Sequence, residues 1–273
     1  MKIKFLCPYW GKEGTNAIQF IEEVVNAGFD GVEIGPPDDS HFISELKRAI
    51  AENNLVLVSQ QYLPPEKETV DDYINRMEKL LIRGIELEPS FINSHTGKDH
   101  FTFEENCKAI DKCFELSEKF NTHINHETHR GRFNFCAALT RQYLDNYSEL
   151  KLTADYSHWV TVSESFLEDQ ESSLNEAIKR STYIHARIGH TQSPQVADPF
   201  APENEIYLNK FLDWWQQILG NAKDTGQQEF YICPEFGPMP YMPTYPYSNK
   251  PISCQWDLNI KMMNYLKKEL TSY

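Results

Sequence analysis

The feature that most constrains the fold of this chain is a regular alternation of short apolar runs with longer amphipathic segments. Runs rich in β-branched and aromatic residues occupy positions 2–10, 29–37 and 55–65, and a segment with helical periodicity follows each of them. The first such segment, residues 16–28, ends in a glycine, which is a common stop signal of helices. The alternation continues through eight strand–helix units, and the fifth, sixth and seventh strands are expected over residues 122–129, 150–159 and 182–189. This order predicts an α/β fold with parallel strands.

The length of the chain favours closing these units into a ring. Eight units in about 250 residues are typical of a single (β/α)8 TIM barrel rather than an open doubly wound sheet. No Gly-x-Gly-x-x-Gly follows a predicted strand, which weakens the dinucleotide-binding alternative. No low-complexity linker divides the sequence, so we expect one TIM-barrel domain over residues 1–273.

Composition narrows the classes of partner and compartment. The formal net charge is -14, and an acidic chain repels phosphate backbones, so nucleic acid is not an expected partner. The six cysteines form no Cys-x-x-Cys pair, which is typical of a reduced intracellular protein. The first residues lack the apolar region of a signal peptide, and no stretch is long enough to span a membrane. We therefore expect a cytoplasmic protein without membrane contact; a homo-oligomer is compatible with the sequence.

Polar side chains occur near the end of almost every predicted strand, where a barrel of this kind carries its functional groups. They are Glu33, Gln60, Gln61, His95, Glu127, Asp155, His158, His185, Arg187 and Glu235. Buried charges are costly unless they are paired or bound to a cation. We therefore predict that Glu127, Asp155, His185 and Glu235 hold one divalent metal ion. Three carboxylates and one imidazole suit Mn²⁺, Mg²⁺, Co²⁺ or Zn²⁺.

Each of these residues also has a structural interpretation. Asp155 alone is more typical of a helix N-cap than of a metal ligand. His126 and His129 flank Glu127, and strand alternation predicts that both point away from it. Tyr241, Tyr245 and Tyr247 are more typical of loop packing than of a sugar-binding platform. The metal hypothesis rests on four candidate ligands in phase on four successive strands.

Several motifs resemble the xylose isomerase-like TIM-barrel superfamily over essentially the whole chain. They are "FDGVEIG", "NHETH", "ADYSHW", "IHARIGH" and "CPEFG". This superfamily contains sugar isomerases, ketose 3-epimerases, inosose dehydratases and endonuclease IV-type DNA repair enzymes. The resemblance implies that Glu127, Asp155, His185 and Glu235 are the metal ligands. His158 matches a histidine that contacts substrate in the epimerases and a third metal in the nucleases.

The departures from the family pattern are informative. The ketose 3-epimerases carry a second glutamate after the strand-five ligand, where this chain has "HRGRF" with Arg130 and Arg132. These arginines either face an anionic group of the substrate or pair with surface acids. The nuclease branch needs a histidine near strand three and an Asp-x-His pair after strand seven. This chain has Gln60, Gln61 and "ADPF" there, so DNA repair is a weak alternative.

The resemblance and the residues together predict a metal-dependent sugar isomerase or epimerase. Glu127 and Glu235 would act as acid and base through an enediolate of a small carbohydrate or sugar acid. His158, Arg187, His95 and Glu33 would bind substrate oxygens, and Trp10 would cover an apolar face of the substrate. The alternatives are an inosose-type dehydratase on the same metal site and a barrel that binds its ligand without turnover.

Overall fold

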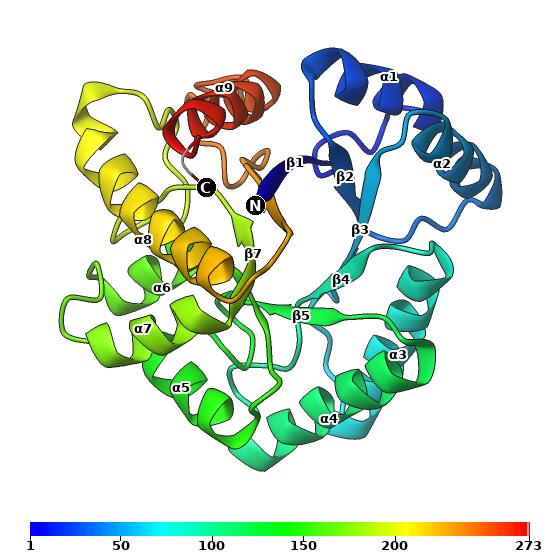
Figure 1. The fold of residues 1–273 in the computed structure, drawn as a ribbon, viewed down its shortest axis with the longest axis vertical. Coiled ribbons are helices and arrows are strands. Elements are labelled where there is room, and N and C mark those ends of the chain that lie inside the picture. Colours follow the sequence, from blue (N-terminus) through cyan, green and yellow to red (C-terminus); the bar gives the residue numbers. More distant parts are fainter. Residues whose placement is uncertain (272) are drawn as a thin grey trace.

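The computed structural model describes residues 1–271 and 273 and has a closed barrel of parallel strands surrounded by helices (Figure 1). Each strand pairs with its sequence neighbours, and β1 closes the ring against β8. The predicted (β/α)8 barrel is therefore confirmed. The strands are β1 (Lys2–Pro8), β2 (Gly31–Ile34), β3 (Val56–Gln61), β4 (Phe91–Ser94), β5 (Ile124–Glu127), β6 (Leu152–Ala154), β7 (Ser181–His185) and β8 (Glu229–Cys233).

The helices form where the sequence supplies an apolar stripe together with end signals. Thr102 and Glu105 form a capping box at the start of α4, and Gly28 ends α1 with a left-handed φ of 82°. The helices are α1 (Ala17–Ala27), α2 (Ser40–Glu52), α3 (Val70–Glu86), α4 (Phe103–Phe120), α5 (Ala137–Asn146), α6 (Tyr156–Ser163), α7 (Glu171–Arg180), α8 (Glu205–Asp224) and α9 (Gln255–Glu269), with a 3₁₀ helix at Pro202–Asn204.

The interior of the barrel is a packed core and not a pore. Leu6, Val58, Phe91, Tyr183 and Cys233 are buried together there. The rings of Phe91 and Tyr183 meet edge to face with their centroids 5.1 Å apart. This packed layer closes the barrel interior below the carboxyl ends of the strands, so a ligand can reach the site only from that end of the barrel.

The sixth strand differs most from its prediction. The sequence suggested a strand over residues 150–159, but β6 ends at Ala154 and Tyr156 begins helix α6. Asp155 caps that helix, because its Oδ1 accepts a hydrogen bond from the Ser157 backbone N–H at 3.1 Å. Strands β5, β7 and β8 also end at or before their first polar site residue, since the chain leaves the ladder there to enter the mouth loops.

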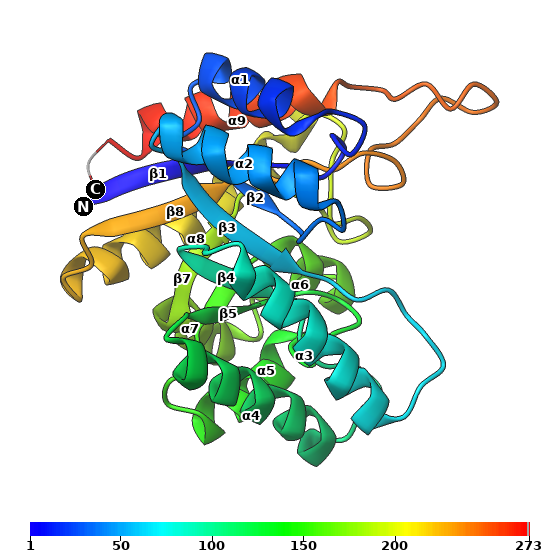
Figure 2. The same ribbon diagram turned by 90° about the vertical axis from the view of Figure 1, so that its right-hand side faces the viewer.

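The long loops and the termini lie at opposite ends of the barrel. Figure 2 shows the β3–α3 and β8–α9 loops projecting on the side toward which the strands point, while both termini lie on the other side. The terminal ammonium of Met1 donates to the Tyr273 carbonyl oxygen at 2.8 Å. Among the described residues, no helix has both the length and the apolar character needed to cross a bilayer.

Candidate metal centre and active site

Four side chains from the carboxyl ends of successive strands converge above the packed layer. Glu127 ends β5, Asp155 follows β6, His185 ends β7 and Glu235 lies two residues after β8. One nitrogen or oxygen atom from each lies within 4.8 Å of the other three, and all four residues are buried. Glu235 adopts a left-handed φ of 52°, a costly conformation for a non-glycine residue that is common at functional sites.

His185 lies at the centre of this group and is oriented from below. Its Nε2 is 2.9 Å from a carboxylate oxygen of Glu33, which places a proton on Nε2 and directs Nδ1 toward the other carboxylates. Nδ1 is 2.7 Å from Glu235 Oε2, yet neither atom has a partner in hydrogen-bond alignment. Metal-binding histidines are commonly held in this way, with the second ring N–H donated to a carboxylate.

Burial and neighbouring charges shift the pKa values of these four residues. Burial raises the pKa of Glu127 to about 7 and that of Asp155 to about 6, although His185 and Arg187, respectively, oppose these shifts. Burial also acts to raise the pKa of Glu235, but His185 and Arg187 outweigh it and lower that pKa to about 2. Burial lowers the pKa of His185, and the surrounding carboxylates override burial and raise it well above its usual value.

These residues fit a divalent metal ion. Four buried carboxylates, those of Glu33, Glu127, Asp155 and Glu235, surround one imidazole and the Arg187 guanidinium. The positive charges of these two side chains do not balance the four carboxylates, and a bound metal ion is one of the few ways to stabilise the group. The oxygen-rich donor set, with a single nitrogen ligand from His185, is compatible with Mg²⁺, Mn²⁺, Co²⁺ and Zn²⁺.

Both carboxylate oxygens of Glu33 accept hydrogen bonds from neighbouring side chains. Its Oε1 accepts from the Asn93 amide at 3.0 Å, and its Oε2 accepts from the Tyr183 hydroxyl and from His185. Asn93 also donates to Glu127 at 2.6 Å. Sequence reasoning missed Asn93, although it lies two residues before His95 and therefore on the same strand face. Glu33 reaches the cavity wall, but its contacts are those of a residue that orients His185.

Arg187 joins the metal-centre group to the cavity above it. Its Nη2 donates to the Asp155 carboxylate and lies 3.1 Å from His158 Nε2, while its Nε and Nη1 have no hydrogen-bond partner. Arg187 lines the cavity, as a substrate-binding residue must. His158 is fully buried beneath Arg187 and is not among the residues of the cavity wall.

The cavity above the carboxylates has a volume of about 580 Å³, which is the size range of small-molecule sites. Its wall combines aromatic and polar side chains. They include Trp10, Gln60, Tyr62, His95, Glu127, His129, Arg187, Glu235 and Tyr241. Of the predicted site residues, Trp10, Glu33, His95, Glu127, Arg187 and Glu235 line this cavity, whereas Asp155, His158 and His185 are buried behind its wall.

Two cavity residues contradict their predicted placement. His129 was expected to point away from Glu127, but its ring lies 4.7 Å from that of His95 and 3.8 Å from that of His158. Residues two apart on a strand share a face, so alternation places His129 on the same side as Glu127, and the expectation was wrong even though β5 itself ends at Glu127. Tyr241 places its hydroxyl 3.3 Å from His129 Nε2, so it belongs to the site and not merely to loop packing.

The flanking residues behave differently from these two. His126 points away from the site as expected, and its Nδ1 lies 2.8 Å from Thr96 Oγ1. Arg132 is buried, donates to the Leu63 carbonyl at 3.2 Å and lies over the Tyr62 ring. Arg130 lies over the Tyr241 ring. Among the described residues neither arginine pairs with a carboxylate, and neither lines the cavity, so the structure supports neither of the two predicted roles.

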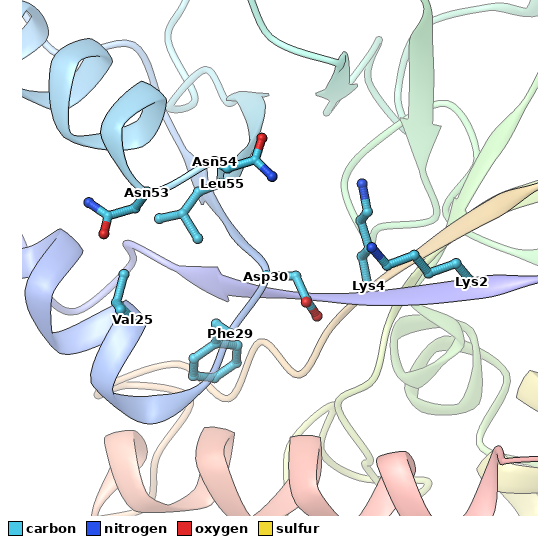
Figure 3. Close-up of a pocket in the computed structure, with 8 residues that line it drawn as sticks. All are labelled: Lys2, Lys4, Val25, Phe29, Asp30, Asn53, Asn54 and Leu55. Atoms are coloured by element: carbon cyan, nitrogen blue, oxygen red, sulfur yellow. The ribbon is translucent and has the colours of Figure 1, made fainter.

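A second hollow lies at the opposite end of the barrel and lacks such chemistry. It has a volume of about 270 Å³, and Figure 3 shows Lys2 and Lys4 of β1 facing it with Asp30. Asp30 accepts a hydrogen bond from the Phe5 backbone N–H, and Lys4 pairs with Glu229. Groups used in this way at the amino-terminal face of a barrel serve stability.

Comparison with known proteins agrees with this architecture. The model of the xylose isomerase-like TIM barrel family matches residues 21–204, which is more than half of the chain. The chain belongs to this family. This family contains enzymes that catalyse several types of reaction. A search of curated protein sequences gives no match.

Solved structures similar to the chain share its fold at low sequence identity. A D-tagatose 3-epimerase-like protein is 13% identical with a TM-score of 0.69, and the match covers 99% of this chain and 97% of that one. The probable 3-DHS dehydratase AsbF from Bacillus anthracis is 16% identical with a TM-score of 0.61 and coverage of 98% and 99%. A xylose isomerase-like protein from Mycobacterium smegmatis, in complex with magnesium, is 12% identical with a TM-score of 0.66 and coverage of 98% and 97%.

Proposed function

We propose that this protein is a metal-dependent isomerase or epimerase of a small polyhydroxylated compound, a sugar or a sugar acid. The observation that carries the proposal is the group of Glu127, Asp155, His185 and Glu235 within 4.8 Å at the base of a small-molecule cavity. A divalent ion held there would supply Lewis acidity to a carbonyl oxygen and a neighbouring hydroxyl. The magnesium bound in the Mycobacterium smegmatis structure supports this choice of cofactor.

The two glutamates would move the proton. They come from β5 and from the segment after β8, and each lies beside His185 Nδ1, at 3.5 Å for Glu127 and 2.7 Å for Glu235. One carboxylate takes the proton from the carbon next to the carbonyl. Its return to the adjacent carbon gives isomerisation, and delivery by the second glutamate to the opposite face of the same carbon gives epimerisation.

The remaining cavity residues would bind and orient the substrate. Arg187 has two buried N–H-bearing atoms without partners and so can donate to a substrate oxygen. Trp10 and Tyr241 meet edge to face at 5.1 Å over the site and would cover an apolar face of the substrate and exclude water. Glu33 would act as a positioning residue through its contact with His185.

Dehydration is the second candidate, and the position of Tyr241 favours it. Tyr241 lines the cavity, and its hydroxyl lies next to His129. This hydroxyl would protonate a departing hydroxyl while a glutamate removes the proton of the neighbouring carbon. The similarity in fold to the probable 3-DHS dehydratase AsbF is compatible with this chemistry.

Exchange of substrate hydrogen with D₂O tests the proposal. We expect Glu127→Gln and Glu235→Gln to keep at least part of the metal affinity and to lose exchange by about 10²–10⁴-fold. Glu229→Gln, at the other end of β8 and half-exposed, is the matched control and should exchange at the wild-type rate. Exchange that survives in both site variants would refute the two-glutamate mechanism. An unsaturated product would favour dehydration, and absence of exchange with a broad panel of sugars and sugar acids would refute catalysis of either kind.

A further inference from the structure

Two buried cationic side chains in the loops after β4 and β5 have no counter-ion. Among the described residues, three lysine or arginine side chains are buried, those of Lys98, Arg132 and Arg187. Arg187 pairs with Asp155, whereas no carboxylate of the described residues forms an ion pair with Lys98 or Arg132, although the chain has a net charge of -14. Burying a charge without a partner is costly. We propose that Lys98 and Arg132 together bind a small oxyanion, a carboxylate or a phosphate.

Lys98 is held in place by a loop that is itself well fixed. The Asn106 side chain accepts from the Lys98 backbone N–H at 3.0 Å and donates to the Lys98 carbonyl oxygen at 3.0 Å. Gly97 permits this contact, since it has a left-handed φ of 67° and an added Cβ would lie 2.3 Å from Asn106 Oδ1. Lys98 Nζ then lies 5.1 Å from the centroid of the buried Tyr73 ring. An aromatic ring attracts an ammonium group but does not neutralise it.

Arg132 brings a second positive charge from the β5–α5 loop. Its Nη2 donates to the Leu63 carbonyl oxygen at 3.2 Å, and its guanidinium lies 5.1 Å from the centroid of the Tyr62 ring. Its Nε is buried and has no hydrogen-bond partner. Burial lowers the pKa of Lys98 to about 8, and the positive charge of Arg132 contributes to this shift. The two cations are thus close enough to repel each other, and an anion bound to both would remove this repulsion.

The acids around Lys98 are already paired. The carboxylates whose charges act on it belong to Glu68 and Asp99. Both oxygens of Glu68 accept from Arg76, at 3.0 and 2.7 Å, and Asp99 is exposed and lies 3.2 Å from His100 Nδ1. The counter-ion of the buried pair therefore has to come from outside the described part of the chain. The planar guanidinium and the ammonium group are the donors that proteins use for carboxylates and phosphates.

The proposed anion site adjoins the cavity but is not part of its wall. Tyr62 lines the cavity, whereas Arg132, which packs on the Tyr62 ring, and Lys98 do not. The oxyanion has two possible sources, a free anion and an anionic group carried by the ligand of the cavity. Only the second source rests on the proposed function.

Chemical labelling of Lys98 tests the site without use of activity or metal, so its failure is distinct from failure of the proposed function. The full-length protein is treated with trace acetic anhydride at about pH 8, in phosphate or in chloride of equal ionic strength, and acetylation of each lysine is followed by mass spectrometry. A bound anion favours the ammonium form, so phosphate should slow acetylation of Lys98 about fivefold, as a rise of about one unit in its pKa requires. Lys119 is the matched control, because its Nζ also lies 5.1 Å from a ring centroid, that of Phe120, but the side chain is exposed.

D-Gluconate and the uncharged D-glucitol separate the two sources. Protection of Lys98 by phosphate would show that a free anion is sufficient. Protection by D-gluconate alone would show that a polyhydroxylated compound must carry the carboxylate. Both results support the site, whereas equal protection by D-glucitol would overturn it, because no anion would then be needed.

Variants assign the binding to the two side chains. Titration calorimetry with the protecting anion should show an affinity about 10–100-fold lower in Lys98→Met, which keeps the length of the side chain and loses its charge. Arg132→Gln should weaken binding in the same way, and Lys119→Met should bind as the wild type does. Absence of protection by both phosphate and D-gluconate, or an unchanged affinity in Lys98→Met, would overturn the proposal. The labelling of the wild type decides even if a variant fails to fold.

Discussion

Asp155 shows how one carboxylate serves two elements at once. Its Oδ1 caps helix α6, while its Oδ2 accepts from Arg187. The capping interpretation and the site interpretation of this residue are therefore both compatible with its geometry. His126 is the contrasting case at the same scale, since it is adjacent to Glu127 in sequence but faces the layer between the barrel and the helices.

The protonation of His126 gives a prediction at this scale. Burial lowers its pKa to about 3 from the usual 6.5, so between these values the unfolded chain binds more protons than the folded one. The contribution of His126 to stability is complete above the pKa that this histidine has in the unfolded chain, and it is lost as the pH falls below that pKa. Lowering the pH from 7.5 to 5 should cost the wild type about 2 kcal/mol from His126 alone. Urea unfolding of His126→Gln should show an acid loss smaller by that amount, and an unchanged loss would contradict the assignment.

At the scale of elements, the mouth loops are tied to one another and set the upper wall of the cavity. Gln195, in the loop after β7, is buried and accepts from the Gly237 backbone N–H at 2.8 Å while donating to the Gly237 carbonyl at 3.1 Å. Gly237 in turn lies against Trp10 from the loop after β1. A Cβ added at Gly237 would come within 2.1 Å of the indole ring of Trp10. The position of Trp10 over the cavity therefore depends on a glycine in a loop distant in sequence.

We therefore predict that Gly237→Ala displaces Trp10 and weakens ligand binding. Overpacking of this kind costs about 1–3 kcal/mol. We expect the indole ring of Trp10 to turn away from Gly237, so that the contact between the two loops is lost. The expected result is a rise in KM about tenfold with a smaller change in kcat. Gly14→Ala is the control, because a Cβ there meets nothing within 4 Å. Equal KM values in the two variants would show that Trp10 does not depend on Gly237.

Across the whole molecule, the candidate metal centre connects half of the barrel. Its four residues come from β5 to β8, and Glu33 extends the contact network to β2. Repulsion among these carboxylates opposes closure of the barrel in the absence of a cation. Binding that requires the closed barrel should stabilise the entire fold by mass action.

The thermal midpoint should thus rise when metal is added. At a free Mn²⁺ concentration about a hundredfold above its Kd, the free energy of unfolding should increase by about 2.7 kcal/mol, and a chelator should reverse this increase. Asp155→Asn should reduce the gain, while Glu229→Gln, outside the site, should retain it. Equal midpoints with metal and with chelator in the wild type would argue against a metal centre that spans the strands.

The barrel could be predicted from the sequence alone, and with it the end at which the candidate site residues lie. The alternation of apolar runs with amphipathic segments is local information, and in a barrel of parallel strands it necessarily brings Glu127, His185 and Glu235 to one end. The points at which the strands stop pairing depend on contacts between segments distant in sequence. Because β6 stops at Ala154, His158 lies in a helix beneath Arg187. His129 lies two residues after the end of β5, and its ring packs against those of His95 and His158. The contacts of Tyr241 with His129 and of Glu33 with His185 join segments far apart in the chain, and no periodicity in the sequence encodes such distances.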